Sequence, residues 1–478
     1  MGVRVALGGR RAGRAAMRAR RVPEVALAGA VGAALGMAAA VVAADPSDRA
    51  KLVLVALIAP FVVALVGDLR RVLLAVVLLN IPFQWDVYFG YRDDIDRLAA
   101  LAGWGVSATT LALAGLYALW IAQLLVRPET TGRPRLRSAV LPATFFALLL
   151  ASLAVAQDRV VAGFQIALYG QALLLFVYLA STVRSRGDLR FVVVMLLAGL
   201  CLESMVTIAL WASGGSLDVP GIATRNTAAV GGGSRVGGTI GSPNNAGAYF
   251  AFMFALGGSI YLSRVDARLR YLALAGCLLA LPALVLTLSR GAWIACLVSV
   301  GVLVLASPGR RLSPPAVGAL ALTMVIVLVP LQGTISERLA RNDEGAAASR
   351  VPLVQMAGEM IADHPVLGVG ANNFVVELPG YAGGRFAEVW LSSVHNKYLL
   401  IGSEAGIGAL TAFLAFVAAT FLRAWRARRA SDPLTAAVGA GLAAAVAGHA
   451  VHMNFDIFAG GATTDMLWVA AAVAASPA

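Results

Sequence analysis

Long runs of apolar residues, separated by short polar segments, follow one another along almost the whole chain. At roughly 20 residues per span, about fourteen of these runs are long enough to cross a bilayer. Their approximate centres lie at residues 34, 58, 77, 115, 146, 171, 202, 254, 279, 299, 323, 410, 444 and 469. The runs near 58 and 77 leave an alternative open, because they can also form a re-entrant hairpin. The pattern predicts an all-α polytopic membrane protein with about 14 transmembrane helices.

Composition supports a membrane protein. Of the 478 residues, 59% are hydrophobic and 13% are charged, and the mean hydropathy is +0.81, which is far outside the usage of globular domains. In a soluble protein the net charge of +13 would suggest nucleic acid binding. Here much of the basic excess lies in short loops, so we expect a lipid bilayer and no nucleic acid as partner. The three cysteines lie in apolar segments without metal-ligand spacing.

The charge of the connecting loops alternates along the chain. If the arginine-rich N-terminus is cytoplasmic, the predicted inner loops are short and basic: GDLRR, VRPETTGRPRLR, RSRGDLR, SRVDARLR, SPGRRLSPP and RAWRARRASD. Predicted outer loops such as DVYFGYRDDIDR and AQDRV are balanced or acidic. Because short cytoplasmic loops carry the excess of Lys and Arg, we expect a multi-pass protein of the bacterial inner (plasma) membrane with both termini in the cytoplasm. The apolar run at 24–44 is too long for a signal peptide and is interpreted as the first span.

Two predicted outer segments are too long to be simple connectors, and we therefore expect them to be functional. Residues from about 214 to 243 are rich in glycine. Residues 333–397 form the largest stretch outside the membrane, a periplasmic loop between the helices near 323 and 410. Within this loop, SRVPLVQMAGEMIA at 349–362 has a helical pattern.

Motifs at the outer edges of predicted spans carry the candidate chemistry. In chain order they are Arg235-Val-Gly-Gly-Thr-Ile-Gly-Ser-Pro-Asn244, Ser289-Arg290-Gly291, Arg350 through His364-Pro-Val-Leu-Gly-Val-Gly-Ala-Asn-Asn-Phe374, and His395-Asn396-Lys-Tyr-Leu through Glu404-Ala-Gly-Ile-Gly408. Together they resemble the O-antigen ligase family, whose relatives include polysaccharide polymerases and bacterial O-linked oligosaccharyltransferases. The resemblance covers roughly 190–425, and the first part of the chain is similar only in being a run of spans.

The resemblance implies a fold similar to the GT-C class and transfer of a glycan from undecaprenyl diphosphate at the periplasmic face. It implies that Arg235 and Arg290 contact the diphosphate, that His395 is the base, and that no cofactor takes part. The acceptor is lipid A-core, another glycan or a protein in different branches, and the shared motifs leave this choice open. Polysaccharide-assembly proteins are the implied partners. The expected regions are 1–23 (basic cytoplasmic N-terminus), 24–190 (N-terminal transmembrane helices), 191–425 (catalytic region) and 426–478 (C-terminal transmembrane helices).

The arginines also point to a diphosphate on physical grounds. Guanidinium recognises phosphate oxygens bidentately and keeps its charge. Arg290 lies at the joint of two closely spaced spans, and Arg235 lies in a glycine-rich run that allows close backbone approach. Asn244 belongs to the start of the next helix, whose dipole favours an anion. The alternatives are an arginine that reaches the lipid headgroups and an incidental arginine in a flexible loop.

A histidine is suited to accept a proton from a sugar hydroxyl near neutral pH. We therefore expect His395 to be the base, with Asn396 orienting it or the substrate, whereas the alternative is a structural histidine. Arg350 opens the amphipathic segment of the outer loop. Glu404 lies deeper in the helix, as a structural partner or an aid to the electrostatics of the site. The predicted catalytic residues are His395, Arg290 and Arg235, and the predicted substrate-binding residues are Arg350, Asn396, Asn244 and Glu404.

The expected mechanism is a single, inverting displacement without a metal ion, because the arginines neutralise the leaving diphosphate. One alternative is a metal-dependent GT-C enzyme that uses the acidic loop Asp93–Asp96. His449 and His452 also have ligand spacing, but they lack a third ligand. A second alternative is a polytopic transporter or lipid-glycan flippase. The polar constellation at one face of the membrane favours the enzyme.

Overall fold

The computed structural model describes residues 68–126, 134–214, 235–306, 346–382 and 392–476, with separate positions between 314 and 336. The predicted spans near 34 and 58 and most of the glycine-rich segment lie outside the described residues. The described elements are α3 (Leu69–Phe83), β1 (Asp86–Phe89), α4 (Asp93–Asp96), β2 (Trp104–Ser107), α5 (Ala108–Val126), η1 (Leu136–Ala139), α6 (Val140–Ala151), η2 (Ser152–Ala154), α7 (Arg159–Thr182), α8 (Arg186–Ala212), η3 (Gly238–Ile240), α9 (Pro243–Tyr261), α10 (Ala267–Leu286), α11 (Arg290–Ala306), α13 (Ala346–Asp363), α14 (Phe374–Ala382), α15 (Lys397–Ala427), α16 (Pro433–His452) and α17 (Gly461–Ala475).

Where the structure describes the chain, helices occupy the positions at which the hydropathy pattern places spans. Among the described residues, seven helical stretches are long and apolar enough to cross a membrane, namely α5, the continuous stretch η1–α6–η2, α7, α8, α10, α15 and α16. Helices α11 and α17 are apolar but shorter. The described part of the chain is therefore mostly helical and multi-pass, as predicted, and the count of fourteen spans remains a prediction.

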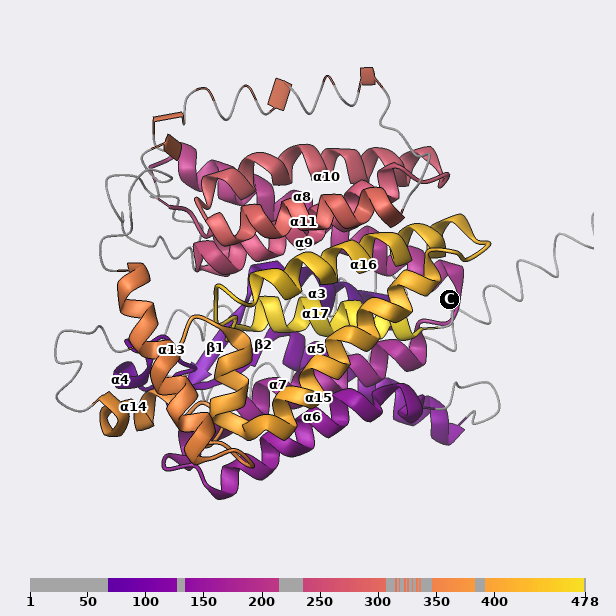
Figure 1. The fold of residues 1–478 in the computed structure, drawn as a ribbon. Coiled ribbons are helices and arrows are strands. Elements are labelled where there is room, and N and C mark those ends of the chain that lie inside the picture. Colours follow the sequence, from indigo (N-terminus) through magenta and orange to yellow (C-terminus); the bar gives the residue numbers. More distant parts are fainter. Residues whose placement is uncertain are drawn as a thin grey trace, which may run out of the picture.

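Helix α16 is the most buried of these candidate spans. Figure 1 shows α8–α11 on one side of it and α6, α7 and α15 on the other. Its glycines allow close approach, because Gly441 packs against Leu256 of α9 and Gly448 packs against Ala295 of α11. Small residues have this role where helices meet in a membrane. The packing places the end of α16 beside the starts of α11 and α15.

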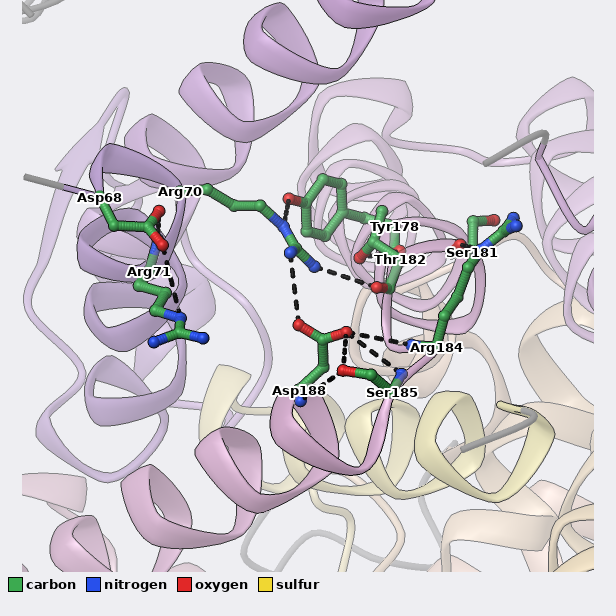
Figure 2. A network of polar contacts seen from close by, with 9 residues as sticks. All are labelled: Asp68, Arg70, Arg71, Tyr178, Ser181, Thr182, Arg184, Ser185 and Asp188. Carbon is green, nitrogen blue, oxygen red and sulfur yellow. Dashed lines mark hydrogen bonds and ion pairs between the residues drawn. The ribbon is translucent and has the colours of Figure 1, made fainter. Parts of the chain in front are cut away.

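One end of the bundle, here called the basic end, is held by ionic contacts between loops. Figure 2 shows Arg70 of α3 donating to Tyr178 (3.3 Å), to the Thr182 carbonyl (3.0 Å) and to Asp188 (3.4 Å). Ser185 and Asp188 form the capping box that begins α8. Two further ion pairs join loops at this end, Arg186–Asp432 and Arg190–Asp266. Segments that the charge pattern assigns to inner loops thus meet in one place.

The opposite end, here called the His395 end, carries the hairpin β1–β2 and the helices α4, α13 and α14. These elements lie together at the left of Figure 1, away from the C-terminus. The hairpin differs from the sequence-based prediction, which places a loop without strands in this region. It is antiparallel, and Tyr88 lies opposite Gly105. A Cβ at 105 would lie 3.3 Å from the Tyr88 ring, so glycine makes room for the aromatic side chain.

Helix α15 is interrupted at Gly406, which has φ 81° and ψ 174°. Residues 365–373, which precede α15 and are here called the clamp segment, pair with the interruption. Val369 donates its N–H to the Ser403 carbonyl (2.8 Å), and Ile407 donates to the Pro365 carbonyl (2.9 Å). Backbone groups inside a membrane protein need such partners. The clamp segment therefore supplies hydrogen bonds that the helix itself cannot make at this point.

Two asparagines extend the clamp segment to other elements. Asn372 exchanges hydrogen bonds with the backbone of Leu101, next to the hairpin (3.2 and 2.8 Å). Asn373 does the same with the backbone of Asp158, which caps α7 (2.8 and 3.1 Å). In addition, Ser393 donates its N–H to the Leu98 carbonyl (3.1 Å). The clamp segment and these contacts fix the loop that carries His395.

The two ends should lie on opposite sides of the membrane, with the His395 end outside. In a protein whose native cysteines are replaced, Gly380→Cys in α14 should react with a membrane-impermeant maleimide on intact cells. Ser431→Cys, at the basic end, should react only after lysis. Both positions are exposed, so differences in reactivity report sidedness. The reverse pattern would contradict the orientation and the placement of the site.

The clamp segment should tolerate a side chain poorly at Gly370. This glycine has φ 105°, and a Cβ there would lie 2.5 Å from the Ala156 Cα. Gly370→Ala is expected to lower the free energy of unfolding by about 1–3 kcal/mol, the usual cost of such backbone strain, measured as a lower melting temperature in detergent. Gly358→Ala is the control, because that position lies in α13 and faces open space. If Gly370→Ala melted at the same temperature as the control, the clamp segment would not contribute to stability as expected.

Candidate functional site

Arg235 joins two of the predicted motifs at the His395 end. Its Nε donates to the Thr287 carbonyl (3.0 Å), and its Nη2 donates to Asn244 Oδ1 (2.7 Å). Thr287 follows the last residue of α10, three residues before Arg290 begins α11. Asn244 lies in the first turn of α9. The arginine therefore ties the glycine-rich motif to the joint that carries Arg290, which the sequence could not show.

The glycine-rich motif folds as a tight turn directly before a helix. The Gly241 N–H donates to the Gly237 carbonyl (3.2 Å). Gly238 and Gly241 both have positive φ, 58° and 86°, a conformation that glycine adopts without strain. Helix α9 then begins at Pro243, as predicted, because proline is favoured in the first turn. The turn thus brings Arg235 back beside the start of α9.

The joint between α10 and α11 packs closely against the end of α16 at Gly291. Leu288 has φ 49° there, and the Ala292 N–H donates to Ser289 Oγ (3.4 Å) at the start of α11. A Cβ on Gly291 would lie 2.8 Å from Nε2 of His452. The glycine therefore allows the last residue of α16 to touch the helix start that carries Arg290.

One ring nitrogen of His395 makes a hydrogen bond within the protein. Its Nδ1 lies 3.0 Å from the Ser393 carbonyl oxygen. A carbonyl can only accept, so Nδ1 must carry the proton, and Nε2 of the neutral ring keeps a lone pair. Burial lowers the pKa of His395, and Arg350 lowers it further, whereas Asp456 raises it. The residue is therefore a neutral imidazole near neutral pH, which is the form that accepts a proton.

Asn396 and Lys397 fix the position of His395 from the C-terminal side. Asn396 caps α15, since its Oδ1 accepts from the N–H groups of Tyr398 (3.0 Å) and Leu399 (3.1 Å). The Lys397 N–H donates to the Met453 carbonyl (2.8 Å). The capping oxygen of Asn396 is thus used by the helix, and any contact of this residue with a substrate remains a prediction.

Asp456 lies near His395, a proximity that the sequence motifs do not indicate. It is buried, and its Oδ1 accepts from the Ile457 N–H (2.8 Å). It lies close enough to His395 to raise the pKa of that histidine. In the sequence it follows the pair His449 and His452, which suggested only a weak metal site. Its proximity to His395 depends on the docking of α15 against α16, which no local pattern reveals.

Two of the predicted substrate-binding residues differ in their surroundings. Arg350 is exposed on α13, near enough to His395 to affect its pKa. Glu404 is buried in α15, and its Oε2 accepts from Gln165 Nε2 of α7 (3.2 Å). This contact agrees with the structural alternative for Glu404. Contact of either residue with a substrate remains a prediction.

An arginine binds the acidic loop Asp93–Asp96, which the metal-dependent alternative uses as its ligands. Arg92 binds both carboxylate oxygens of Asp94 (2.9 and 2.7 Å) and one of Asp158 (3.1 Å). Within the part of the chain that the structure describes, no group of three or more His, Cys, Asp or Glu side chains is arranged to hold a metal ion. Arg92 thus links this loop to the start of α7, which Asp158 caps.

The fold and the site together define a multi-pass helical membrane protein with arginines and a histidine gathered at one end. Residues 275–414 match the O-antigen ligase family, and this match confirms the resemblance that the motifs predicted. The matched region includes Arg290, Arg350, His395 and Glu404, whereas Arg235 and Asn244 lie before it. The match indicates a membrane enzyme of the O-antigen ligase or polymerase type. No curated protein matches the chain.

Proposed function

We propose that the protein transfers a glycan from undecaprenyl diphosphate to an acceptor hydroxyl at the periplasmic face, with inversion and without a metal ion. The observation that carries the proposal is the bond from Arg235 to the Thr287 carbonyl. Through this bond Arg235 lies beside the α10–α11 joint, where Arg290 begins α11. Both arginines are at the same end of the bundle as the neutral imidazole of His395. The match to the O-antigen ligase family supports the same chemistry.

The arginines would bind the diphosphate. Helix α9 begins at Pro243 and α11 begins at Arg290, and the Arg235 bonds bring these two helix starts together. The N-terminus of a helix favours an anion, so the region combines guanidinium groups with two helix dipoles. Charge that develops on the departing diphosphate is stabilised there, and this is the step that such preorganised donors accelerate.

His395 would activate the acceptor. As the hydroxyl oxygen attacks the anomeric carbon, its proton passes to Nε2 of His395. The bond from the anomeric carbon to the diphosphate oxygen breaks, and undecaprenyl diphosphate leaves with the electron pair. The imidazolium that forms is stabilised by the buried carboxylate of Asp456. One displacement inverts the anomeric centre, and the arginines make a divalent cation unnecessary.

One observation favours the transporter alternative, namely the interruption of α15 at Gly406. Broken helices are common at the substrate sites of secondary transporters. In this chain, however, the carbonyls of Ser403 and Glu404 next to the interruption accept from the clamp segment. The interruption is therefore filled by protein backbone, and we favour the enzyme.

The test is single-turnover transfer by the purified protein in detergent, with an undecaprenyl-diphosphate-linked glycan as donor. Lipid A-core is added in one arm and omitted in the other. Growth of lipid-linked chains from donor alone supports a polymerase, and transfer that needs lipid A-core supports a ligase. Activity should persist in EDTA. Loss of activity in EDTA with recovery on adding Mg²⁺ would contradict metal independence, and uptake of solute into proteoliposomes without transfer would favour the transporter.

The rate of transfer should rise with pH and then level off, because only neutral His395 accepts a proton. Arg350 lowers the pKa of His395 and Asp456 raises it. Arg350→Ala should therefore move the midpoint of the rise to higher pH, and Asp456→Asn should move it to lower pH. Single-turnover rates at saturating donor measure these midpoints. A midpoint that is the same in all three proteins would show that another group titrates.

A further inference from the structure

Glu203 is a carboxylate buried inside the bundle and outside the site described so far. It lies on α8 and is fully enclosed. Burying a carboxylate costs free energy unless hydrogen-bond donors surround it. Its position in an apolar membrane helix therefore calls for a specific partner, and ionisable residues in such helices are usually functional.

The partner is the turn that carries Arg235. Glu203 Oε1 accepts from the Thr239 N–H (2.9 Å), and Oε2 accepts from Thr239 Oγ1 (2.5 Å). Thr239 Oγ1 also lies 2.9 Å from the Pro82 carbonyl oxygen at the end of α3. Both carboxylate oxygens of Glu203 are therefore used on one residue of the turn. The contact ties α8, the turn and α3 together.

The turn packs directly against the Glu203 side chain, with no room for a Cβ at position 238. Gly238 has φ 58°, and a Cβ there would overlap the Glu203 carboxylate and crowd Thr207 Oγ1. Thr239 lies four residues after Arg235 in the chain, inside the turn that the bond from the Gly241 N–H to the Gly237 carbonyl closes. Holding Thr239 in place thus restricts the backbone of Arg235.

We propose that Glu203 is a positioning residue for the donor diphosphate, acting through the turn that presents Arg235. This inference rests on the proposed function, because it assumes that Arg235 binds the diphosphate. Glu203 itself lies in the bundle and does not touch the substrate. Its carboxylate fixes the turn before the ligand arrives, so that the guanidinium group does not have to be ordered on binding.

The proposal predicts a difference between two substitutions. Glu203→Ala removes the partner of the buried Thr239 N–H and should weaken binding of undecaprenyl diphosphate about tenfold to hundredfold, the usual cost of leaving a buried donor without an acceptor. Glu203→Gln should keep most of the affinity. The glutamine oxygen can accept from the Thr239 N–H, and its amide N–H can donate to Thr239 Oγ1, whose single proton then goes to the Pro82 carbonyl instead of to position 203.

The experiment measures binding of undecaprenyl diphosphate to the full chain in detergent. Ser204→Ala is the matched control, since Ser204 is the next residue on α8, is equally buried, and its hydroxyl contacts no hydrogen-bonding group among the described residues. Arg235→Ala and the double variant Glu203→Ala/Arg235→Ala complete a cycle. If Glu203 acts through Arg235, the double variant binds no more weakly than Arg235→Ala. A general loss of stability would instead weaken binding in both backgrounds.

Hydrogen exchange at residues 235–242 gives a readout that does not depend on glycan transfer. Exchange should be faster in Glu203→Ala and near wild type in Glu203→Gln and Ser204→Ala. Unchanged exchange in Glu203→Ala would overturn the positioning role. If Arg235→Ala weakens binding and Glu203→Ala does not, this inference alone fails. If Arg235→Ala itself leaves binding unchanged, the proposed function fails at Arg235, and the inference fails with it.

Discussion

Replacing Arg290 by alanine is expected to abolish glycan transfer while the protein still reaches the membrane. Loss of one preorganised charge-stabilising donor typically lowers the rate by about two to three orders of magnitude. Arg290 begins α11 beside a joint that Arg235 also contacts, so Arg235→Ala should have a similar effect. Lysine at either position should rescue only partly, because it keeps the charge and loses the bidentate geometry.

The measurement is single-turnover transfer from the lipid-linked donor, with membrane abundance followed by immunoblot. Arg159→Ala is the matched control, since Arg159, like Arg290, is an arginine in the first position of a helix at the His395 end. It should retain near wild-type transfer. Wild-type activity in Arg290→Ala or Arg235→Ala would remove the diphosphate role of that residue.

Replacing His395 by alanine should lower turnover by about two to four orders of magnitude, the usual contribution of a general base. The Nδ1 contact with the Ser393 carbonyl leaves Nε2 as the acceptor, and alanine offers no substitute. Binding of undecaprenyl diphosphate should change little, because the arginines carry that contact. His395→Gln should retain part of the activity if the residue only orients the acceptor through a hydrogen bond.

Transfer and lipid binding must be measured in parallel for this variant. Lost binding with an unaffected chemical step at saturating donor would make His395 part of the donor pocket. Asn396→Ala is a useful companion, because it removes the cap of α15 without removing the imidazole. It should lower stability by about 1 kcal/mol and turnover far less than His395→Ala.

The features predicted correctly from the sequence depend on local chemistry. Proline at 243 favours a helix start, and α9 begins there. The break at Ser289–Gly291 separates α10 from α11, and the periodic segment 349–362 lies within α13 (Ala346–Asp363). Each of these signals resides in a few neighbouring residues. The association of Arg235 with Arg290 was expected only through the resemblance, and the structure supplies a physical link through Thr287.

The features that were missed depend on contacts between distant segments. The hairpin strands are only four residues each, too short for a clear alternation. Gly406 looks in sequence like any glycine of an apolar run, and its positive φ follows from pairing with the clamp segment. Asp456 and Glu203 acquire their partners only when helices dock. Such partners cannot be read from periodicity, because the pattern records burial and not the identity of the neighbour.

The contacts of Arg235 and His395 also bear on how this architecture can be recombined. Residues 275–414 match the O-antigen ligase family, yet Arg235 and the Asp456 carboxylate lie outside that stretch on either side. A chimera that exchanges only 275–414 between relatives would separate His395 from its carboxylate neighbour and the α10–α11 joint from Arg235. Exchange points should instead fall before α8 and after α17. Residues 275–414 are thus not expected to work when exchanged alone. In such hybrids the choice of substrate should follow the source of the whole stretch from α8 to α17.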